Sequence, residues 1–207
     1  MTSEIRQVGA RENRVTRRDR NGTFEFDPHH CFACGELNEH GLHLQLHTDP
    51  ERSWTELTLE SQFQGWDSVA HGGIVCTILD EVMAWSVIGR GTWGVTARLN
   101  VAFRRPIPIG RPIRAEGRVT QEHRRAFRTA GEVRDLSTSE LLATAEGTFI
   151  AVPPDQLARL EARYGMRRTG QPAPAKDVLE TSESAETAGW ADTTDLVASV
   201  VDAGRAS

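Results

Sequence analysis

One stretch decides the fold of this 207-residue chain: Ala70-His71-Gly72-Gly73-Ile74-Val75-Cys76-Thr77-Ile78-Leu79-Asp80-Glu81-Val82-Met83-Ala84-Trp85. The paired glycines open an expected helix that runs from Gly73 to about Ile88, and its apolar residues cover more than one face. A helix that is apolar nearly all round is wrapped by other structure instead of lying on a surface. Two acids sit in its middle, although Asp and Glu are almost never fully buried unless they are paired. The stretch therefore predicts a buried central helix that carries a site.

Segments on both sides of this helix have the patterns of strands. Residues 41–47 alternate strictly between Leu and polar side chains, and residues 54–59 follow after a turn, so the two predict a hairpin. Four more strands are expected at 95–103, 113–123, 125–135 and 141–152. Their short connections favour antiparallel neighbours. Together the segments predict an α+β fold, in which a curled antiparallel β-sheet wraps around one long central helix, with flexible termini.

The ends of the chain differ in composition from its middle. Residues 1–28 form an Arg-rich arm, expected to be flexible or a loosely attached helix, and the domain itself is expected at 29–152. A short C-terminal helix is expected within 153–168. Residues 169–207 are acidic and poor in large apolar groups, so we expect them to be mostly disordered, with a short helix at 195–201 at most.

Charge and composition exclude several classes of function. The net charge is −5, from 24 basic and 29 acidic residues, which lacks the basic excess of a nucleic-acid-binding protein. No apolar run is long enough to span a membrane, and the N-terminus lacks the apolar core of a signal peptide. The three cysteines do not form an even disulfide framework. These features together favour a cytoplasmic location.

Three motifs carry a resemblance to a known family. They are Gln64-Gly65-Trp66 shortly before His71-Gly72-Gly73, then Leu79-Asp80-Glu81, and then Thr96-Ala97-Arg98-Leu99-Asn100-Val101-Ala102-Phe103-Arg104-Arg105-Pro106-Ile107-Pro108. Residues 29–152 thereby resemble the hotdog-fold acyl-CoA thioesterases of the phenylacetate-degradation and hydroxybenzoyl-CoA thioesterase type. The resemblance implies hydrolysis of an acyl-CoA to the free acid and CoA without a cofactor. It also implies a homodimer or homotetramer with active sites at the dimer interface.

The helix supplies the first candidate catalytic groups. Asp80 matches the acidic position of the family, where it would act as general base or as nucleophile, and the sequence does not choose between these roles. Glu81 points about 100° away around a helix, which favours a supporting or dimer-interface role. Gly72 would donate its backbone N–H to the oxyanion, because the start of a helix offers unpaired N–H groups. Gly73 is placed with the substrate-binding residues, although packing alone explains a glycine there.

Neighbouring segments supply supporting candidates. His71 is interpreted as a residue that orients the loop before the helix, within reach of substrate. Gln64 lies on that loop, where the resemblance implies a side chain that holds the carbonyl or the water. Thr96 begins the strand after the helix and would contact the water or Asp80. Asn100 is expected to share the face of Thr96, since alternate residues of a strand lie on one side.

Four arginines are candidates for binding the phosphates of coenzyme A: Arg104, Arg105, Arg124 and Arg125. Each lies near an expected strand end. Solubilising charge at the sheet edge is the alternative interpretation of each.

A Cys-x-x-Cys pair, Cys31 and Cys34, lies in the loop before the first expected strand. A zinc site would need four ligands, for which His30 and one of His40 or His43 are the available partners. A tight turn that packs the loop over the helix is the favoured interpretation of the pair, and we expect no metal. Two other functions stay open: a non-catalytic acyl-CoA-binding hotdog module, and a hotdog enoyl-CoA hydratase or dehydratase.

Overall fold

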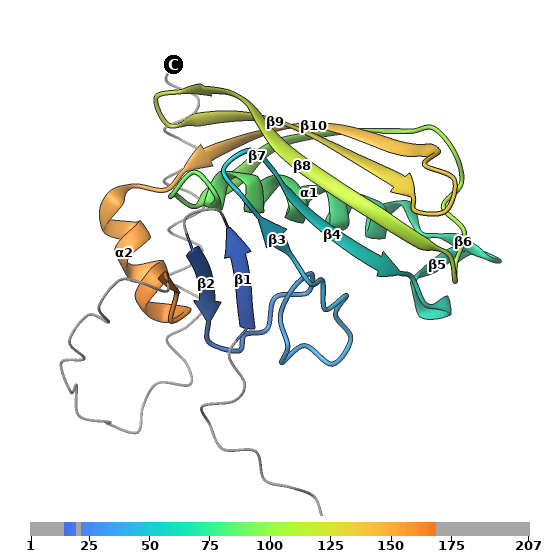
Figure 1. The fold of residues 1–207 in the computed structure, drawn as a ribbon, viewed down its shortest axis with the longest axis horizontal. Helices are drawn as coiled ribbons and strands as arrows, with labels where there is room; N and C mark the ends of the chain where they lie inside the picture. The colour runs from blue at the N-terminus through green and yellow to red at the C-terminus, as the bar shows by residue number, and fades with distance from the viewer. Residues whose placement is uncertain (1–14, 20–21, 169–207) are drawn as a thin grey trace, which may run out of the picture.

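The computed structural model describes residues 15–19 and 22–168 (Figure 1). The elements in chain order are β1 (Val15–Asp19), β2 (Gly22–Phe26), β3 (His47–Thr48), β4 (Ser53–Thr58), a 3₁₀ turn (Ser61–Phe63), β5 (Gln64–Trp66), β6 (Val69–Ala70), α1 (Gly72–Ile88), β7 (Gly94–Phe103), β8 (Pro112–His123), β9 (Ala126–Asp135), β10 (Leu141–Ala151), α2 (Pro154–Arg163) and β11 (Arg167–Arg168). The expectations for residues 1–14 and 169–207, including the acidic tail, fall outside the described residues.

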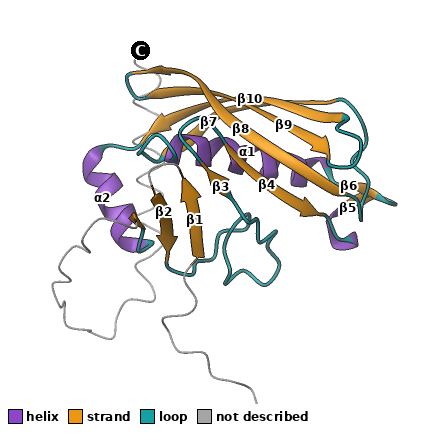
Figure 2. Cartoon of the chain, in the orientation of Figure 1, coloured by secondary structure: helices purple, strands orange, loops and turns teal. Residues whose placement is uncertain are grey.

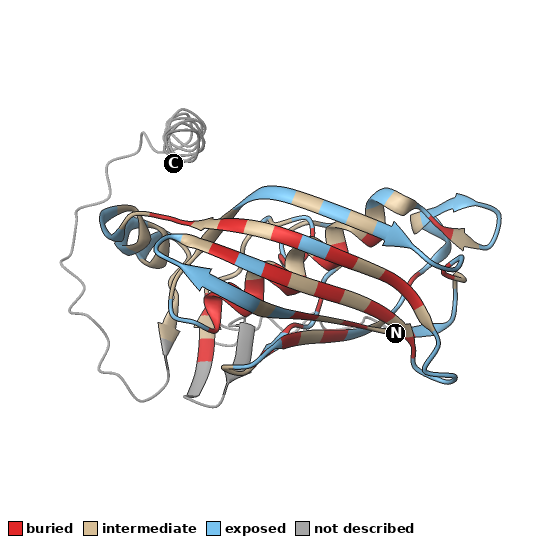
Figure 3. Ribbon diagram, turned by 90° about the horizontal axis from the view of Figure 1, so that it is seen from above, coloured by how far each residue is buried: buried red, intermediate tan, exposed pale blue. Residues whose placement is uncertain are grey.

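A six-stranded antiparallel sheet in the order β3-β4-β8-β9-β10-β7 curves over the long helix α1. Figure 2 shows the helix beneath the arch of strands. Buried residues alternate with less buried ones along β8, β9 and β10, because one face of each strand packs on the helix (Figure 3). This architecture confirms the predicted α+β hotdog fold.

The helix lies unusually close to the middle of the sheet. A Cβ atom at Gly117 on β8 would lie 2.6 Å from the backbone carbonyl of Val82, a distance that real Cβ atoms do not reach. Glycine is therefore required there for the close approach of two backbones. The hydroxyl of Ser53 on β4 donates to the same carbonyl oxygen. Ile78, Leu79 and their apolar neighbours on α1 are fully buried in consequence.

The predicted strand at 41–47 is wrong for most of its length. Only His47 and Thr48 pair with β4, although the alternation of buried Leu and exposed polar residues persists. The backbone of His43 has a φ of 48°, which breaks an extended strand. The N–H of Leu44 donates instead to the carbonyl of Ala33. The alternating pattern thus predicted which side chains are buried, but not which backbone partner they have.

The N-terminal arm also differs from expectation. Instead of a flexible segment or a helix, β1 and β2 form an antiparallel hairpin, and β11 pairs with the outer side of β2. Figure 1 shows this small sheet below α1, on the side away from the large sheet. Phe24 and Phe26 are buried, and the ring of Phe26 lies 5.2 Å from that of Trp85 on α1. The hydrophobic core therefore begins before residue 29.

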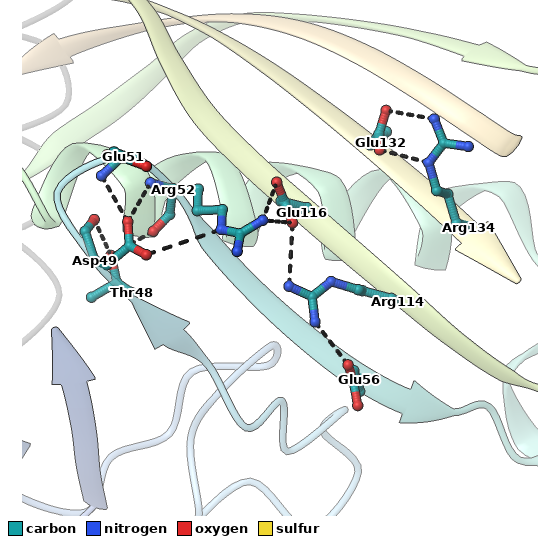
Figure 4. A network of polar contacts seen from close by, with 9 residues as sticks. All are labelled: Thr48, Asp49, Glu51, Arg52, Glu56, Arg114, Glu116, Glu132 and Arg134. Carbon is teal, nitrogen blue, oxygen red and sulfur yellow. Dashed lines mark hydrogen bonds and ion pairs between the residues drawn. The ribbon is translucent and has the colours of Figure 1, made fainter. Parts of the chain in front are cut away.

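The solvent-facing side of β4 and β8 carries a chain of ion pairs (Figure 4). Arg52 contacts Glu116 at 3.0 Å, and Arg114 bridges Glu116 at 3.3 Å and Glu56 at 2.8 Å. Exposed pairs of this kind add at most about 1 kcal/mol each and weaken with salt. This face is accordingly a solvated surface rather than part of the core. Within the described residues, no helix has the length and apolarity needed to cross a membrane.

Candidate active site on the central helix

Within the described residues, the first turn of α1 leaves one backbone N–H group, that of Gly72, without a hydrogen-bond acceptor. His71 is the N-cap residue, and its Nδ1 accepts the N–H of Gly73 at 2.9 Å. The N–H groups of Ile74 and Val75 donate to the carbonyl of His71. Among the contacts of the described chain, the N–H of Gly72 has no acceptor. It therefore stays available to an oxyanion at the positive end of the helix dipole.

Packing within the chain does not require a glycine at position 72. A Cβ atom there would meet only the ring of Phe103, at 3.4 Å, which is ordinary van der Waals contact. Gly73 differs, because a Cβ would come within 3.1 Å of the His71 ring. The N–H of Gly73 is also already used by the N-cap. Gly72, rather than Gly73, therefore has the free donor and the space that a ligand would need.

Asp80 lies two turns further along the helix and faces β7. The hydroxyl of Thr96 donates to Oδ1 of Asp80 at 2.8 Å. Burial raises the pKa of Asp80 above its usual value, and the bond from Thr96 opposes that rise. The structure thus brings together Asp80 and Thr96, two residues singled out from the sequence. Their catalytic roles stay a prediction.

A β-bulge separates Thr96 from Asn100. Thr96 pairs with the buried Phe149 of β10, whereas Arg98 pairs with Thr148 and Asn100 with Glu146. The register shift reverses the alternation at Ala97, so the expectation that Asn100 shares the face of Thr96 is wrong. Asn100 and Arg98 instead line a shallow polar groove of about 410 Å³ on the outer face of the sheet.

Gln64 is placed on β5, in the small hairpin that precedes the helix. Its side-chain oxygen accepts the N–H of Ser68 at 3.3 Å, which is a contact within the hairpin. Gln64 is exposed, and none of its described contacts reaches Asp80. A role in holding the substrate carbonyl or the water therefore stays a prediction.

The four candidate arginines do not gather into one phosphate site. Arg104 and Arg105 follow the end of β7, whereas Arg124 and Arg125 form the turn between β8 and β9, at the opposite end of the sheet. A strand of this length separates the two ends by about 25 Å. Arg105 also pairs with Glu140 at 3.1 Å, and Arg125 donates twice to the carbonyl of Ala151. Within one chain, at most one of these pairs can serve a single CoA.

Strand β7 is an edge of the sheet. It pairs only with β10 in the described chain, and most of its residues are exposed, with Phe103 at 54%. Both candidate groups of α1 border this strand: Gly72 near Phe103, and Asp80 at Thr96. Asp80 lies eight positions after Gly72, which corresponds to about 12 Å along the helix. The site therefore opens along an unpaired strand edge.

Glu81 belongs to a cluster that the sequence did not predict. It lies with Cys31 and Cys34, and the ligand atoms of the three residues are all within 4.8 Å of one another. Its Oε1 accepts the indole N–H of Trp85 at 3.0 Å. Burial raises the pKa of Glu81 to about 7, and a hydrogen bond from Cys34 lowers the pKa of Cys31 to about 5. Glu81 faces the N-terminal loop of its own chain, and the suggested dimer-interface role stays a prediction.

A match to a family model and several relatives agree with this geometry. Residues 67–141 match the model of the thioesterase superfamily. Mouse acyl-coenzyme A thioesterase 13 is 25% identical over 101 residues, which cover 48% of this chain and 72% of that protein. An uncharacterized protein of Schizosaccharomyces pombe is 30% identical over 95 residues, or 44% of this chain and 54% of that one. Mouse acyl-coenzyme A thioesterase THEM4 is 25% identical over 45% of this chain and 40% of its own length.

A solved structure shows the same similarity in three dimensions. The crystal structure of a thioesterase superfamily protein superposes with a TM-score of 0.55 at 26% identity, and covers 58% of this chain and 60% of that one. The chain spans about half the length of the first curated relatives that it matches. The central helix and the strands that follow it are thus similar to the thioesterase superfamily, and the matched range contains the candidate pair Asp80 and Thr96.

The N-cap at His71 gives a prediction about stability. Substitution His71→Ala removes the acceptor for the N–H of Gly73, and should lower the free energy of unfolding by about 1 kcal/mol. His71→Asn supplies a side-chain oxygen suited to the same position and should recover most of that loss. Urea denaturation of the two variants measures the difference. Equal destabilisation by both substitutions would contradict the capping role.

Proposed function

We propose that the protein is an acyl-CoA thioesterase, which hydrolyses an acyl-CoA to a carboxylic acid and CoA. The pairing of Asp80 with Thr96 beside an open strand edge carries this proposal. The match of residues 67–141 to the thioesterase superfamily supports it, as do relatives named acyl-coenzyme A thioesterases. The phenylacetate-degradation type is the finer assignment, and it rests on the sequence resemblance alone.

Asp80 would act on the thioester carbonyl, either directly or through a water. Its carboxylate lies in a half-buried environment with one oxygen held by Thr96, which fixes its orientation. The other oxygen remains for the water or the carbonyl carbon. A held and partly desolvated carboxylate is a stronger base than an exposed one. Thr96 is thereby a positioning residue for Asp80.

The N–H of Gly72 would stabilise the oxyanion of the tetrahedral intermediate. A backbone donor at a helix start is fixed before the reaction, so it needs no reorganisation as charge develops. The absence of a side chain permits the carbonyl to approach this N–H closely. When water is the nucleophile, collapse of the intermediate expels the thiolate of CoA, which takes up a proton, and releases the carboxylic acid. When Asp80 is the nucleophile, collapse expels the thiolate and leaves an anhydride on Asp80, which a water then hydrolyses to the carboxylic acid.

One chain cannot bring these two groups to the same carbonyl. The distance of about 12 Å along the helix between Gly72 and Asp80 is several times the reach of a hydrogen bond. A second copy added antiparallel to the β7 edge would place Gly72 of one chain near Asp80 of the other. The exposed ten-residue edge supports such a dimer, since long unpaired edges are usually covered.

The role of Asp80 is tested by Asp80→Asn. Loss of the base or nucleophile should reduce kcat/KM for acyl-CoA hydrolysis by about 10²- to 10⁴-fold, while the chain stays folded. A thiol-detection assay over short, long and aromatic acyl-CoAs measures the rate. Asp155→Asn, on the exposed first turn of α2, is the matched control and should keep full activity. Tight acyl-CoA binding by the wild type with no thiol released would favour the non-catalytic binding module.

The role of Gly72 is tested by Gly72→Ala. The methyl group fits against Phe103, and alanine favours a helix, so the unfolding temperature should stay unchanged or rise. The same methyl should block the approach of the carbonyl and lower kcat/KM by about 10²-fold. Full activity in a stably folded Gly72→Ala variant would remove Gly72 from the proposed mechanism.

A shared site predicts complementation between two inactive variants. Asp80→Asn and Gly72→Ala subunits that are dissociated, mixed and reassociated should form hybrid dimers with one intact site of two. Random mixing should then restore about a quarter of wild-type activity, because half of the dimers are hybrids. Light scattering should give twice the mass of one chain. No recovery from mixed dimers would show that both groups act within one chain.

A further inference from the structure

Two thiols and one carboxylate converge at a point that the proposed hydrolysis does not use. Cys31 and Cys34 lie in the loop before β3, and Glu81 lies on α1, 47 residues after Cys34. Their Sγ and carboxylate oxygen atoms all lie within 4.8 Å of one another. In a tetrahedral zinc site, with metal–sulfur distances of about 2.3 Å, the sulfur atoms are about 3.8 Å apart. The three groups are thus already close to the spacing of a metal site.

The loop is built to present both sulfur atoms on one side. The N–H of Gly35 donates to the carbonyl of Cys31 at 2.9 Å and closes the turn. A Cβ atom at Gly35 would lie 2.3 Å from the carbonyl oxygen of His29, so only glycine permits this turn. The turn thereby holds both sulfur atoms within 4.8 Å of each other and of a carboxylate oxygen of Glu81. A cysteine binds a metal in its thiolate form.

The carboxylate of Glu81 is also held in a fixed orientation near the two sulfur atoms. The indole N–H of Trp85 donates to Oε1 of Glu81, which orients the carboxylate, and a carboxylate oxygen lies within 4.8 Å of both sulfur atoms. Hydrogen bonds of this kind orient the ligands of metal sites. No Lys or Arg forms an ion pair with Glu81 in the described chain. A carboxylate with no basic ion-pair partner beside two thiols is a donor set that Zn²⁺ can bind.

We propose that Cys31, Cys34 and Glu81 bind one Zn²⁺ ion. On binding, the two thiols lose their protons to solvent, and the two thiolates balance the charge of the metal. The half-exposed side of Cys31 leaves a fourth coordination position for water. His29 does not fill that position, because its Nδ1 accepts the N–H of Cys31 and its ring packs edge-on against Tyr164. The ligand set differs from the His-containing set weighed from the sequence.

Zinc at this point would fasten the N-terminal loop to the helix that carries Asp80. Leu42 and Leu44 already donate their N–H groups to the carbonyls of Phe32 and Ala33, so the loop and the following segment move together. A metal bond from this loop to Glu81 would secure both against α1. This fastening of the loop to α1 is independent of whether the protein hydrolyses acyl-CoA.

The test is metal binding by the full chain, purified under reducing conditions and stripped with a chelator. Dialysis against Zn²⁺ followed by elemental analysis should give one zinc per chain. Titration with Co²⁺ should give the thiolate-to-cobalt charge-transfer absorption and the ligand-field bands of a tetrahedral site. Zn²⁺ should displace the cobalt and raise the unfolding temperature, since it binds only the folded chain.

Variants identify the ligands. Cys31→Ser and Cys34→Ala should each abolish the charge-transfer band or shift it strongly. Glu81→Gln keeps an oxygen for Trp85 and should weaken zinc affinity at least about tenfold, as loss of a metal ligand does. Cys76→Ala is the matched control, because it removes the one cysteine outside the cluster, and it should bind zinc like the wild type.

Three results would overturn the proposal. The first is less than a tenth of a zinc per chain, with no cobalt spectrum. The second is unchanged zinc affinity in Glu81→Gln or Cys31→Ser. The third is a Cys31–Cys34 disulfide that forms under mild air oxidation even with excess Zn²⁺. Mass spectrometry would detect it as a loss of two hydrogens. That last result would instead identify the pair as a redox dithiol.

Discussion

The close contact between α1 and the centre of the sheet is the constraint on which the other features depend. Gly117 lets the backbone of β8 touch the backbone of the helix at Val82, and Gly131 and Gly147 leave room for the side chain of Met83. Because backbone meets backbone at Gly117, the helix can neither slide nor rotate without a clash. Each residue of α1 thereby has a fixed direction, with Asp80 toward β7 and Glu81 toward the N-terminal loop.

Much of the fold could be predicted because its signals are local. An apolar helix after two glycines, and four long alternating strands, are patterns that the backbone obeys wherever they occur. The segment at 41–47 shows the limit of such patterns, since alternation reports which side is buried but not which strand lies alongside. The hairpin at 15–26 was missed for the opposite reason. Strand β1 is arginine-rich and has little apolar alternation, β2 offers only Phe24 and Phe26, and the pairing of β2 with β11 joins residues far apart in the sequence.

The candidate site likewise has features that could be predicted from the sequence and features that could not. The contact between Asp80 and Thr96 was accessible, because a helix and the next strand are neighbours in the chain and the resemblance named both positions. The face on which Asn100 lies could not be predicted. A β-bulge adds one unpaired residue to a strand, leaves no mark in the sequence, and moves every later side chain to the opposite face of the sheet. The cluster around Glu81 needed the tertiary structure. One feature could be predicted from the sequence: Glu81 follows Asp80 directly on a helix, so it points about 100° away and faces a different neighbour.

The bulge at Ala97 has a consequence for how this edge strand can vary. Before it, Thr96 is exposed but faces α1, and its replacement removes the hydrogen bond to Asp80. After it, Arg98 and Asn100 belong to the outer surface, so they can be exchanged without reaching the helix. One strand therefore carries two independent surfaces, divided at a single residue. Relatives can diverge in what they present outward while the inner half keeps its contact with α1.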